Sequence, residues 1–135
     1  SIGKFLTYAE DLMVQEKNKL PLVNENKSLS DAIKIMTRCK QGTLIALNSK
    51  KYLSGILSDG DIRKNSKKNL KNIQVKDLMI KKPITVKKDT LATKCLEIMQ
   101  SKKITKLIVG STLAKKKVKV LGIISIHHIL QANIK

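Results

Sequence analysis

Residues 55–64 read GILSDGDIRK, and residues 122–130 read GIISIHHIL. Both stretches open with glycine, two aliphatic residues and serine, which is typical of a buried strand that turns directly into a helix. Other segments also return later in the chain: Asp11-Leu12-Met13 as Asp77-Leu78-Met79, Ser28-Leu29 as Thr90-Leu91, and Gly42-Thr43 aligned with Ile104-Thr105. The chain therefore holds two copies of one unit. We expect residues 1–66 to form the first copy, with an N-terminal linker segment, and residues 67–135 to form the second.

The sequence pattern of each copy predicts the same order of strands and helices. A short extended segment (residues 20–23 and 84–86) precedes an amphipathic helix, and two apolar runs follow it (43–47 and 52–57; 105–109 and 118–124). A last helix begins at Ser58 or Ser125. This β-α-β-β-α order predicts an α/β (α+β) fold, in which two small sheets with helices on one face pack as a pseudo-two-fold pair.

The amphipathic helices show helical spacing of their apolar residues. The positions are Leu29, Ala32, Ile33 and Met36 in copy one, and Ala92, Cys95, Leu96 and Met99 in copy two. Ser28 with Asp31 predicts a capping box for the first helix, and Asp89 or Thr90 is expected to cap the second.

Length and composition limit the class of protein. The 135 residues are 41% hydrophobic, which is enough for a folded core, but no run of about 18 apolar residues exists to span a membrane. The first residues contain no signal-peptide pattern and no initiator methionine, so we expect a fragment of a longer chain. Cys39 and Cys95 lie in apolar stretches without a CxxC motif, which predicts packing thiols and a reducing, cytoplasmic location.

The net charge of +18 raises the question of nucleic-acid binding. The basic residues are almost all lysines, since Arg38 and Arg63 are the only arginines, and arginine is the preferred base-reading residue. Aromatic residues make up 2% of the chain and offer no stacking surface. A lysine-rich solvated surface that attracts small anions is therefore favoured over a nucleic-acid interface.

The order of elements, the tandem repeat and the Gly-x-x-Ser-x-x-Asp signature at residues 55–61 resemble the cystathionine-β-synthase (CBS) domain, which works as a pair called a Bateman module. The resemblance covers nearly the whole chain. It implies a regulatory module that binds adenine or other nucleotides in clefts between the copies, forms homodimers and reports to an attached enzyme or transporter.

Residues 58–64, SDGDIRK, are similar to a segment of bacterial arabinose-5-phosphate isomerases, which carry a catalytic SIS domain before a CBS pair. This likeness implies that residues 3–6 belong to a linker after the SIS domain. It also implies a regulatory part of an enzyme in the lipopolysaccharide precursor pathway, with CMP-Kdo as a further ligand candidate. No catalytic residue carries over, because the SIS domain is absent from this sequence. Catalysis by this chain alone is the least favoured class, since no nucleophile and base are paired.

Ser58 and Asp61 have two interpretations that the sequence leaves open. Ser-x-x-Asp is a capping box whose acid also complements the helix dipole. In the functional interpretation, the same serine and helix start contact a phosphate, while Asp61 accepts hydrogen bonds from ribose hydroxyls. Gly55 would let the backbone approach a ligand closely.

The remaining candidates are weaker. Thr43 and Thr105 begin the inner strands, Ser125 is a cap and a ligand candidate, and Val23 and Val86 either flank a base or belong to the core. Asp59 and Gly60 lack the ligand spacing of a calcium loop, and adjacent His127 and His128 point about 100° apart on a helix, so no metal is expected. His128 replaces the acid that the resemblance implies, which predicts that ligand prefers the cleft beside Asp61.

We therefore expect a nucleotide-sensing CBS pair that modulates an attached SIS isomerase domain through a population shift. The alternative is an architectural module that holds subunits together without any ligand.

Overall fold

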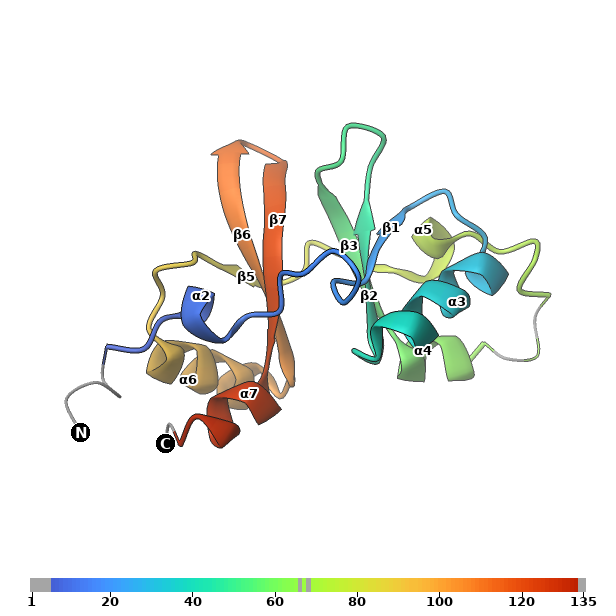
Figure 1. Cartoon of the computed structure of the whole chain (residues 1–135). Helices are drawn as coiled ribbons and strands as arrows, with labels where there is room; N and C mark the ends of the chain where they lie inside the picture. Colours follow the sequence, from blue (N-terminus) through green and yellow to red (C-terminus); the bar gives the residue numbers. More distant parts are fainter. Residues whose placement is uncertain (1–5, 66, 68, 134–135) are drawn as a thin grey trace. The chain divides into compact units, whose positions relative to one another are not determined.

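The structure, a computed structural model, describes residues 6–65, 67 and 69–133. These residues form one four-stranded sheet in the order β1-β2-β3-β4 and one three-stranded sheet in the order β5-β6-β7 (Figure 1). Each sheet carries its own helices, and the β-α-β-β-α order occurs twice. The predicted mixed α/β class is confirmed, and the pseudo-two-fold packing of the two copies stays a prediction. Of the predicted linker at residues 3–6, only Leu6 lies inside the described residues.

The chain divides into two compact units. Unit 2 comprises Glu16–Pro83 and Ala114–Lys117, and the described part of unit 1 lies within Ser1–Gln15, Ile84–Leu113 and Val118–Lys135. The compact units are thus interleaved in sequence, whereas the predicted copies are contiguous. The boundaries of the two sequence copies stay a prediction.

Unit 2 is built from the first copy and a later segment. Its elements are β1 (Leu22–Asn24), α3 (Leu29–Cys39), β2 (Thr43–Leu47), β3 (Leu53–Ser58), α4 (Asp59–Arg63), α5 (Val75–Leu78) and β4 (Ile80–Lys81). β1 pairs with β2 in parallel, and β2–β3 and β3–β4 are antiparallel. The helix α3 links the two parallel strands, as a crossover between parallel strands requires.

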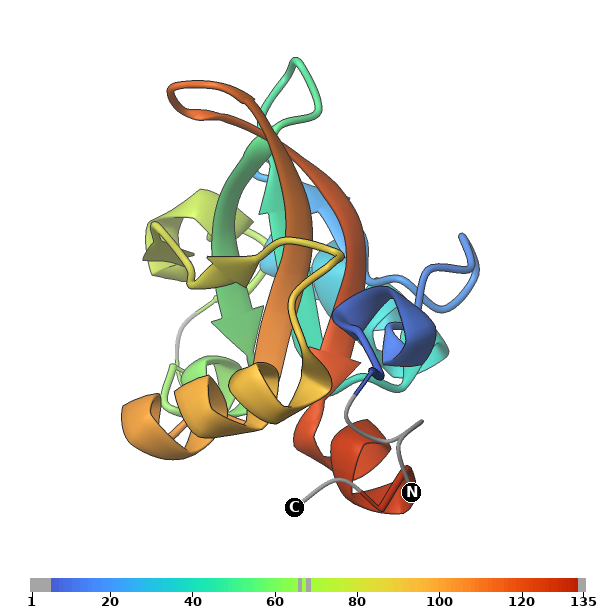
Figure 2. The same cartoon turned by 90° about the vertical axis from the view of Figure 1, so that its left-hand side faces the viewer.

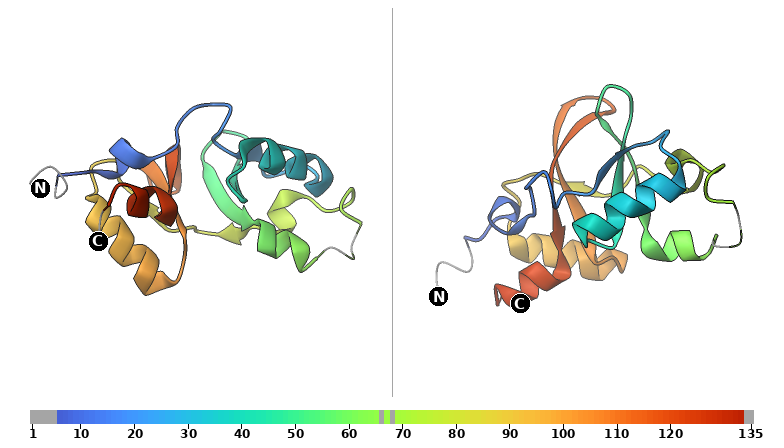
Figure 3. Two further views of the ribbon diagram at one scale, coloured as in Figure 1. Left: turned by 60° about the horizontal axis from the view of Figure 1, so that its bottom comes forward. Right: turned by 45° about the vertical axis from the view of Figure 1, so that its right-hand side comes forward.

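Unit 1 repeats this plan. Its elements are α2 (Ala9–Leu12), β5 (Thr85–Val86), α6 (Ala92–Lys102), β6 (Lys106–Ala114), β7 (Lys117–Ser125) and α7 (Ile126–Gln131). Figure 2 shows β6 and β7, orange and red, as a long hairpin that extends past the short strand β5. The helices α6 and α7 lie side by side (Figure 3).

Each unit is completed by a segment from the other sequence copy. In unit 1, the backbone of Val14 pairs with Ile123, and the amide of Ala92 donates to the carbonyl of Thr7 (2.8 Å). In unit 2, Ile80 pairs with Ile56, and the amide of Leu29 donates to the carbonyl of Ile73 (2.8 Å). We call residues 7–14 and 73–80, which contain the two Asp-Leu-Met motifs, the bridging segments. Each belongs to one sequence copy and packs in the unit that the other copy mainly forms.

The methionines of these motifs explain two of the repeated glycines. A Cβ added at Gly55 would lie 2.6 Å from Sδ of Met79 and 2.9 Å from the carbonyl oxygen of Ile80. A Cβ added at Gly122 would lie 2.7 Å from Sδ of Met13 and 2.8 Å from the carbonyl oxygen of Val14. Glycine is required at both positions because the bridging segment passes directly over the strand.

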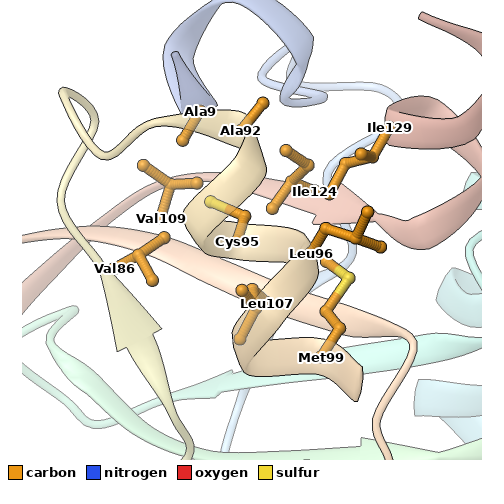
Figure 4. Packing of buried hydrophobic residues seen from close by; sticks show 10 residues of the cluster. All are labelled: Ala9, Val86, Ala92, Cys95, Leu96, Met99, Leu107, Val109, Ile124 and Ile129. Carbon is orange, nitrogen blue, oxygen red and sulfur yellow. The ribbon is translucent and has the colours of Figure 1, made fainter. Parts of the chain in front are cut away.

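The core of unit 1 lies between its helices and its sheet (Figure 4). The buried members drawn there are Ala9, Val86, Ala92, Cys95, Leu96, Met99, Leu107, Val109, Ile124 and Ile129. Unit 2 has the equivalent core of Val23, Leu29, Ala32, Met36, Leu44, Ala46, Leu57, Ile62 and Val75. Both amphipathic helices therefore bury the face that their spacing predicts.

The two amphipathic helices begin differently. Oγ of Ser28 accepts from the amide of Asp31 (3.3 Å), which confirms the predicted cap, while the Asp31 carboxylate pairs with Lys34 (3.7 Å). The predicted cap of α6 by Asp89 or Thr90 is wrong, because Leu91 is its N-cap and no side chain caps it. The first amide of each helix is satisfied in the same way, since the amide of Ala92 donates to the carbonyl of Thr7 and the amide of Leu29 to the carbonyl of Ile73.

No helix among the described residues has both the length and the apolar character that crossing a membrane requires.

Candidate functional site

The unit 2 corner is the point where β3 ends at Ser58 and α4 begins at Asp59. Oγ of Ser58 accepts from the amide of Asp61 (3.2 Å) and donates to Oδ2 of Asp61 (2.8 Å). The amide of Ser58 also donates to Oδ2 of Asp61 (3.1 Å). The predicted capping box is confirmed, and it holds both polar side chains in fixed positions at the helix start.

Thr43 joins this corner through the sheet. It is opposite Ser58 in the β2–β3 register, and it is 4% exposed. The amide of Asp59 donates to the carbonyl of Gly42 (3.1 Å), which ties the beginning of β2 to the beginning of α4. Gly42 adopts φ 66°, a left-handed conformation that favours glycine. The structure therefore brings Thr43, Ser58 and Asp61 together.

The charged residues next to this corner point to solvent. A guanidinium nitrogen of Arg63 lies 3.8 Å from Oδ1 of Asp59, and both side chains are more than half exposed. Exposed pairs of this kind add about 0–1 kcal/mol to stability. Arg63 and Asp59 therefore lie on a solvent-exposed face of α4.

The unit 1 corner has the same backbone and different side chains. Oγ of Ser125, which is 4% exposed, accepts from the amide of His128 (3.2 Å). The amide of Ile126 donates to the carbonyl of Thr105 (2.8 Å). Ser125 is thus a cap, as predicted, but histidine supplies no carboxylate to complete the box. Within the described residues, buried Nδ1 of His128 has no hydrogen-bond partner.

The strand registers correct one part of the sequence alignment. Leu22 is paired with Ile45 and Thr85 with Ile108, so the residue that corresponds to Thr43 is Lys106. The alignment of Thr43 with Thr105 is wrong by one position. Thr105 is exposed and precedes β6, and it contributes a carbonyl to the corner. Matching the apolar triplets at residues 44–46 and 107–109 would have found Lys106.

The other predicted ligand residues have packing roles. Val23 and Val86 are 4% and 8% exposed and belong to the cores of their units. Gly55 is covered by Met79 and the backbone of Ile80. Contact of these three residues with a ligand stays a prediction.

Burial, together with the nearby charges of Lys106 and His127, lowers the pKa of His128 below its ordinary value. The folded state therefore holds this imidazole neutral at a pH where the unfolded state binds a proton. The contribution of neutral His128 to the free energy of unfolding is fully present above the ordinary histidine pKa. It is lost as the pH falls through the lowered pKa of the folded state.

The free energy of unfolding is accordingly expected to fall as the pH is lowered through and below the ordinary histidine pKa of about 6.5. The fall should be smaller in His128→Gln than in the exposed-site control His127→Gln, as measured by urea unfolding. Identical pH dependence in the two variants would contradict this assignment.

Both cysteines are buried packing residues. Cys39 and Cys95 are 3% and 0% exposed, and burial raises the pKa of the Cys95 thiol. In the part of the chain that the structure describes, no three His, Cys, Asp or Glu residues gather as they would around a metal ion.

Comparison with known proteins matches two segments of the chain to one family model. Residues 9–68 and 75–135 each match the model described as "CBS domain". The match therefore covers most of both sequence copies.

Two curated relatives match over almost the whole chain. An uncharacterized protein of Helicobacter pylori is 32% identical over 99% of this chain and 40% of its own length. Arabinose 5-phosphate isomerase KdsD of Escherichia coli is 29% identical over 97% of this chain and 39% of its own length. The chain thus spans about two fifths of the length of these relatives.

Among solved structures, the CBS-pair protein CBSX2 of Arabidopsis thaliana in complex with AMP has a similar fold. The TM-score is 0.75 at 24% identity, and the match covers 94% of this chain and 96% of the plant chain. The likeness extends through both repeats.

Proposed function

The chain belongs to the CBS domain family, as a tandem pair, and from that premise we propose that it is a regulatory module that binds a nucleotide at its strand-to-helix corners. The observation that carries this proposal is the clustering of Thr43, Ser58 and Asp61 at the start of α4.

The unit 2 corner has the chemistry that a ribose requires. Oδ2 of Asp61 is used by Ser58, whereas Oδ1 accepts no hydrogen bond from any described residue. A carboxylate oxygen with free lone pairs can accept from two adjacent ribose hydroxyls. The hydroxyl of Thr43 can donate and accept, while Oγ of Ser58, whose proton is donated to Asp61, keeps one lone pair that can accept from a ligand.

The unit 1 corner has a different chemistry. Lys106 and His128 stand at the positions of Thr43 and Asp61, so the corner has cationic and imidazole groups in place of a hydroxyl and a carboxylate. A lysine attracts a phosphate, but it cannot accept a hydrogen bond from a hydroxyl. We therefore place the ribose in the unit 2 corner.

Adenine nucleotides are the first ligand class to test, since the similar plant protein was solved with AMP. CMP-Kdo is the second, because the sequence is similar to arabinose-5-phosphate isomerases. In this proposal the module works in the cytoplasm, forms a homodimer of CBS pairs, and biases the conformation of a SIS isomerase domain when ligand binds. A ligand acts in this way only if it binds one conformation more tightly than another.

Asp61→Asn is expected to weaken binding of the effective nucleotide about tenfold or more, because a hydrogen bond to a charged group contributes about 1.5–3 kcal/mol. Isothermal titration calorimetry of the chain with AMP, ATP, S-adenosylmethionine and CMP-Kdo measures this change. Asparagine keeps an oxygen that can accept from the Ser58 amide, so the cap is largely retained.

The matched control is Asp77→Asn. Asp77 accepts from the amide of Gln74 (2.9 Å) in the same capping arrangement, on α5 of the same unit. Equal loss of affinity in both variants would mean that capping matters and not ligand contact. No binding of any of the four compounds would leave the architectural module as the better account.

A further inference from the structure

Unit 1 contains a cavity that the strand-to-helix corners do not use. It has a volume of about 580 Å³ and lies between the loop after β5, the outer half of β6 and the beginning of β7. The lining includes Lys87, Lys88 and Lys119, the hydroxyl residues Ser111 and Thr112, and Asp89. Its volume falls within the range of about 300–1,000 Å³ that is usual for small-molecule sites. We call it the lysine pocket.

The lysine pocket is cationic. Three lysines and one aspartate contribute to its lining, and none of these four side chains forms an ion pair with any described residue. A concave surface lined with unpaired positive charge concentrates anions more effectively than a flat one. Leu113 and Leu121 add apolar surface at its wall.

The loop that carries two of the lysines is held in place by the bridging segment. The amide of Glu10 donates to the carbonyl of Lys88 (3.0 Å), and the amide of Ala9 donates to the carbonyl of Thr90 (2.8 Å). Within the loop, the amide of Thr90 donates to the carbonyl of Lys87 (3.1 Å). The backbone of the lysine pocket is therefore ordered before any ligand binds, which lowers the entropy lost on binding.

Opposite the loop, the strands lie close together. A Cβ added at Gly110 would lie 2.7 Å from Cγ1 of Val118. Ser111 and Thr112, which follow Gly110 in β6, line the pocket together with Lys119 of β7. The hydroxyls can donate and accept, and Asp89 can accept from a ligand hydroxyl.

We propose that the lysine pocket binds a small phosphate-bearing molecule whose neutral part carries hydroxyl groups. The lysines bind the phosphate as point charges, and Ser111, Thr112 and Asp89 bind the hydroxyls. This site is separate from the proposed nucleotide site, because all of its lining residues belong to unit 1 and none belongs to a corner. The proposal of a site in the lysine pocket does not depend on whether the corners bind a nucleotide.

The experiment titrates the ¹⁵N-labelled chain with ribose 5-phosphate, inorganic phosphate and ribose at constant ionic strength. Ribose 5-phosphate is expected to shift the amide resonances of Ser111 and Thr112 saturably and at lower concentration than inorganic phosphate, and ribose to leave them unshifted. Equal affinity for ribose 5-phosphate and phosphate would overturn the assignment of the hydroxyl contacts. Absence of a saturable shift would overturn the site itself.

Charge-matched variants distinguish binding in the lysine pocket from non-specific attraction of an anion to a chain with net charge +18. Lys87→Gln and Lys119→Gln are each expected to weaken ribose 5-phosphate binding about threefold or more. Lys102→Gln removes the same charge from the exposed end of α6, outside the pocket, and is expected to change affinity far less. Equal weakening by all three variants would overturn the site in favour of non-specific attraction. Asp61→Asn should leave these resonance shifts unchanged, which distinguishes this test from that of the nucleotide site.

Discussion

Gly55→Ala is expected to lower the free energy of unfolding by about 1–3 kcal/mol, the usual effect of overfilling a packed site. The new Cβ would lie 2.6 Å from Sδ of Met79 and 2.9 Å from the carbonyl oxygen of Ile80. The methionine can move, but the carbonyl belongs to β4, which pairs with β3 at this point. Urea unfolding of the purified variant measures the change. Gly122→Ala should behave alike, because Met13 and Val14 cover it in the same way.

Gly60→Ala is the matched control for this prediction. Gly60 lies in α4, and the atom nearest to an added Cβ would be Oγ of Ser58 at 3.7 Å, an ordinary contact. Alanine is the better helix former by about 1 kcal/mol, so this variant should be neutral or slightly more stable. If the free energy of unfolding of Gly55→Ala equals that of Gly60→Ala, the bridging segment does not pass over β3 as described.

Ala9→Asp is expected to destabilise unit 1 by at least about 3 kcal/mol, because an unpaired charge would be placed in an apolar core. Ala9 is fully buried and lies in the core with Ala92, Val86 and Ile129, although it is far from them in sequence (Figure 4). Native-state hydrogen exchange measures the effect locally. Amides of α6 should lose more protection than amides of β2.

Two variants check the location of this effect. Glu10→Gln changes the exposed neighbour of Ala9 and should leave exchange nearly unchanged. Val75→Asp places a charge at the fully buried first residue of α5 and should reverse the pattern, with greater loss of protection in β2. Greater loss in β2 than in α6 for Ala9→Asp would contradict the assignment of the bridging segment to unit 1.

Periodicity and local patterns predicted most of the fold. The strand at residues 43–47 coincides with β2, and both helix faces are buried as their spacing predicts. Ser58 and Ser125 mark both corners because a serine N-cap after an apolar strand is a local signal, readable without knowledge of tertiary structure. The capping box at Ser58 and Asp61 is confirmed for the same reason.

What the sequence did not reveal depends on contacts between distant residues. The carbonyl of Thr7, which is far from α6 in sequence, accepts a hydrogen bond from the amide of Ala92 at the start of that helix, and no local pattern indicates this contact. Lys106 was missed as the counterpart of Thr43, since a shift of one residue changes which side chain faces the corner. The lysine pocket was missed because a loop and two strands must meet before its lysines share a surface.

The central claim is that the unit 2 corner of a CBS pair binds a nucleotide. Its most direct test is an NMR titration of the ¹⁵N-labelled chain with AMP, followed by ATP, S-adenosylmethionine and CMP-Kdo. At least one compound should saturably shift the amide resonances of Ser58, Asp59 and Asp61, with smaller shifts at Ser125 and His128. If none of the four shifts the corner amides at millimolar concentration, the claim is contradicted.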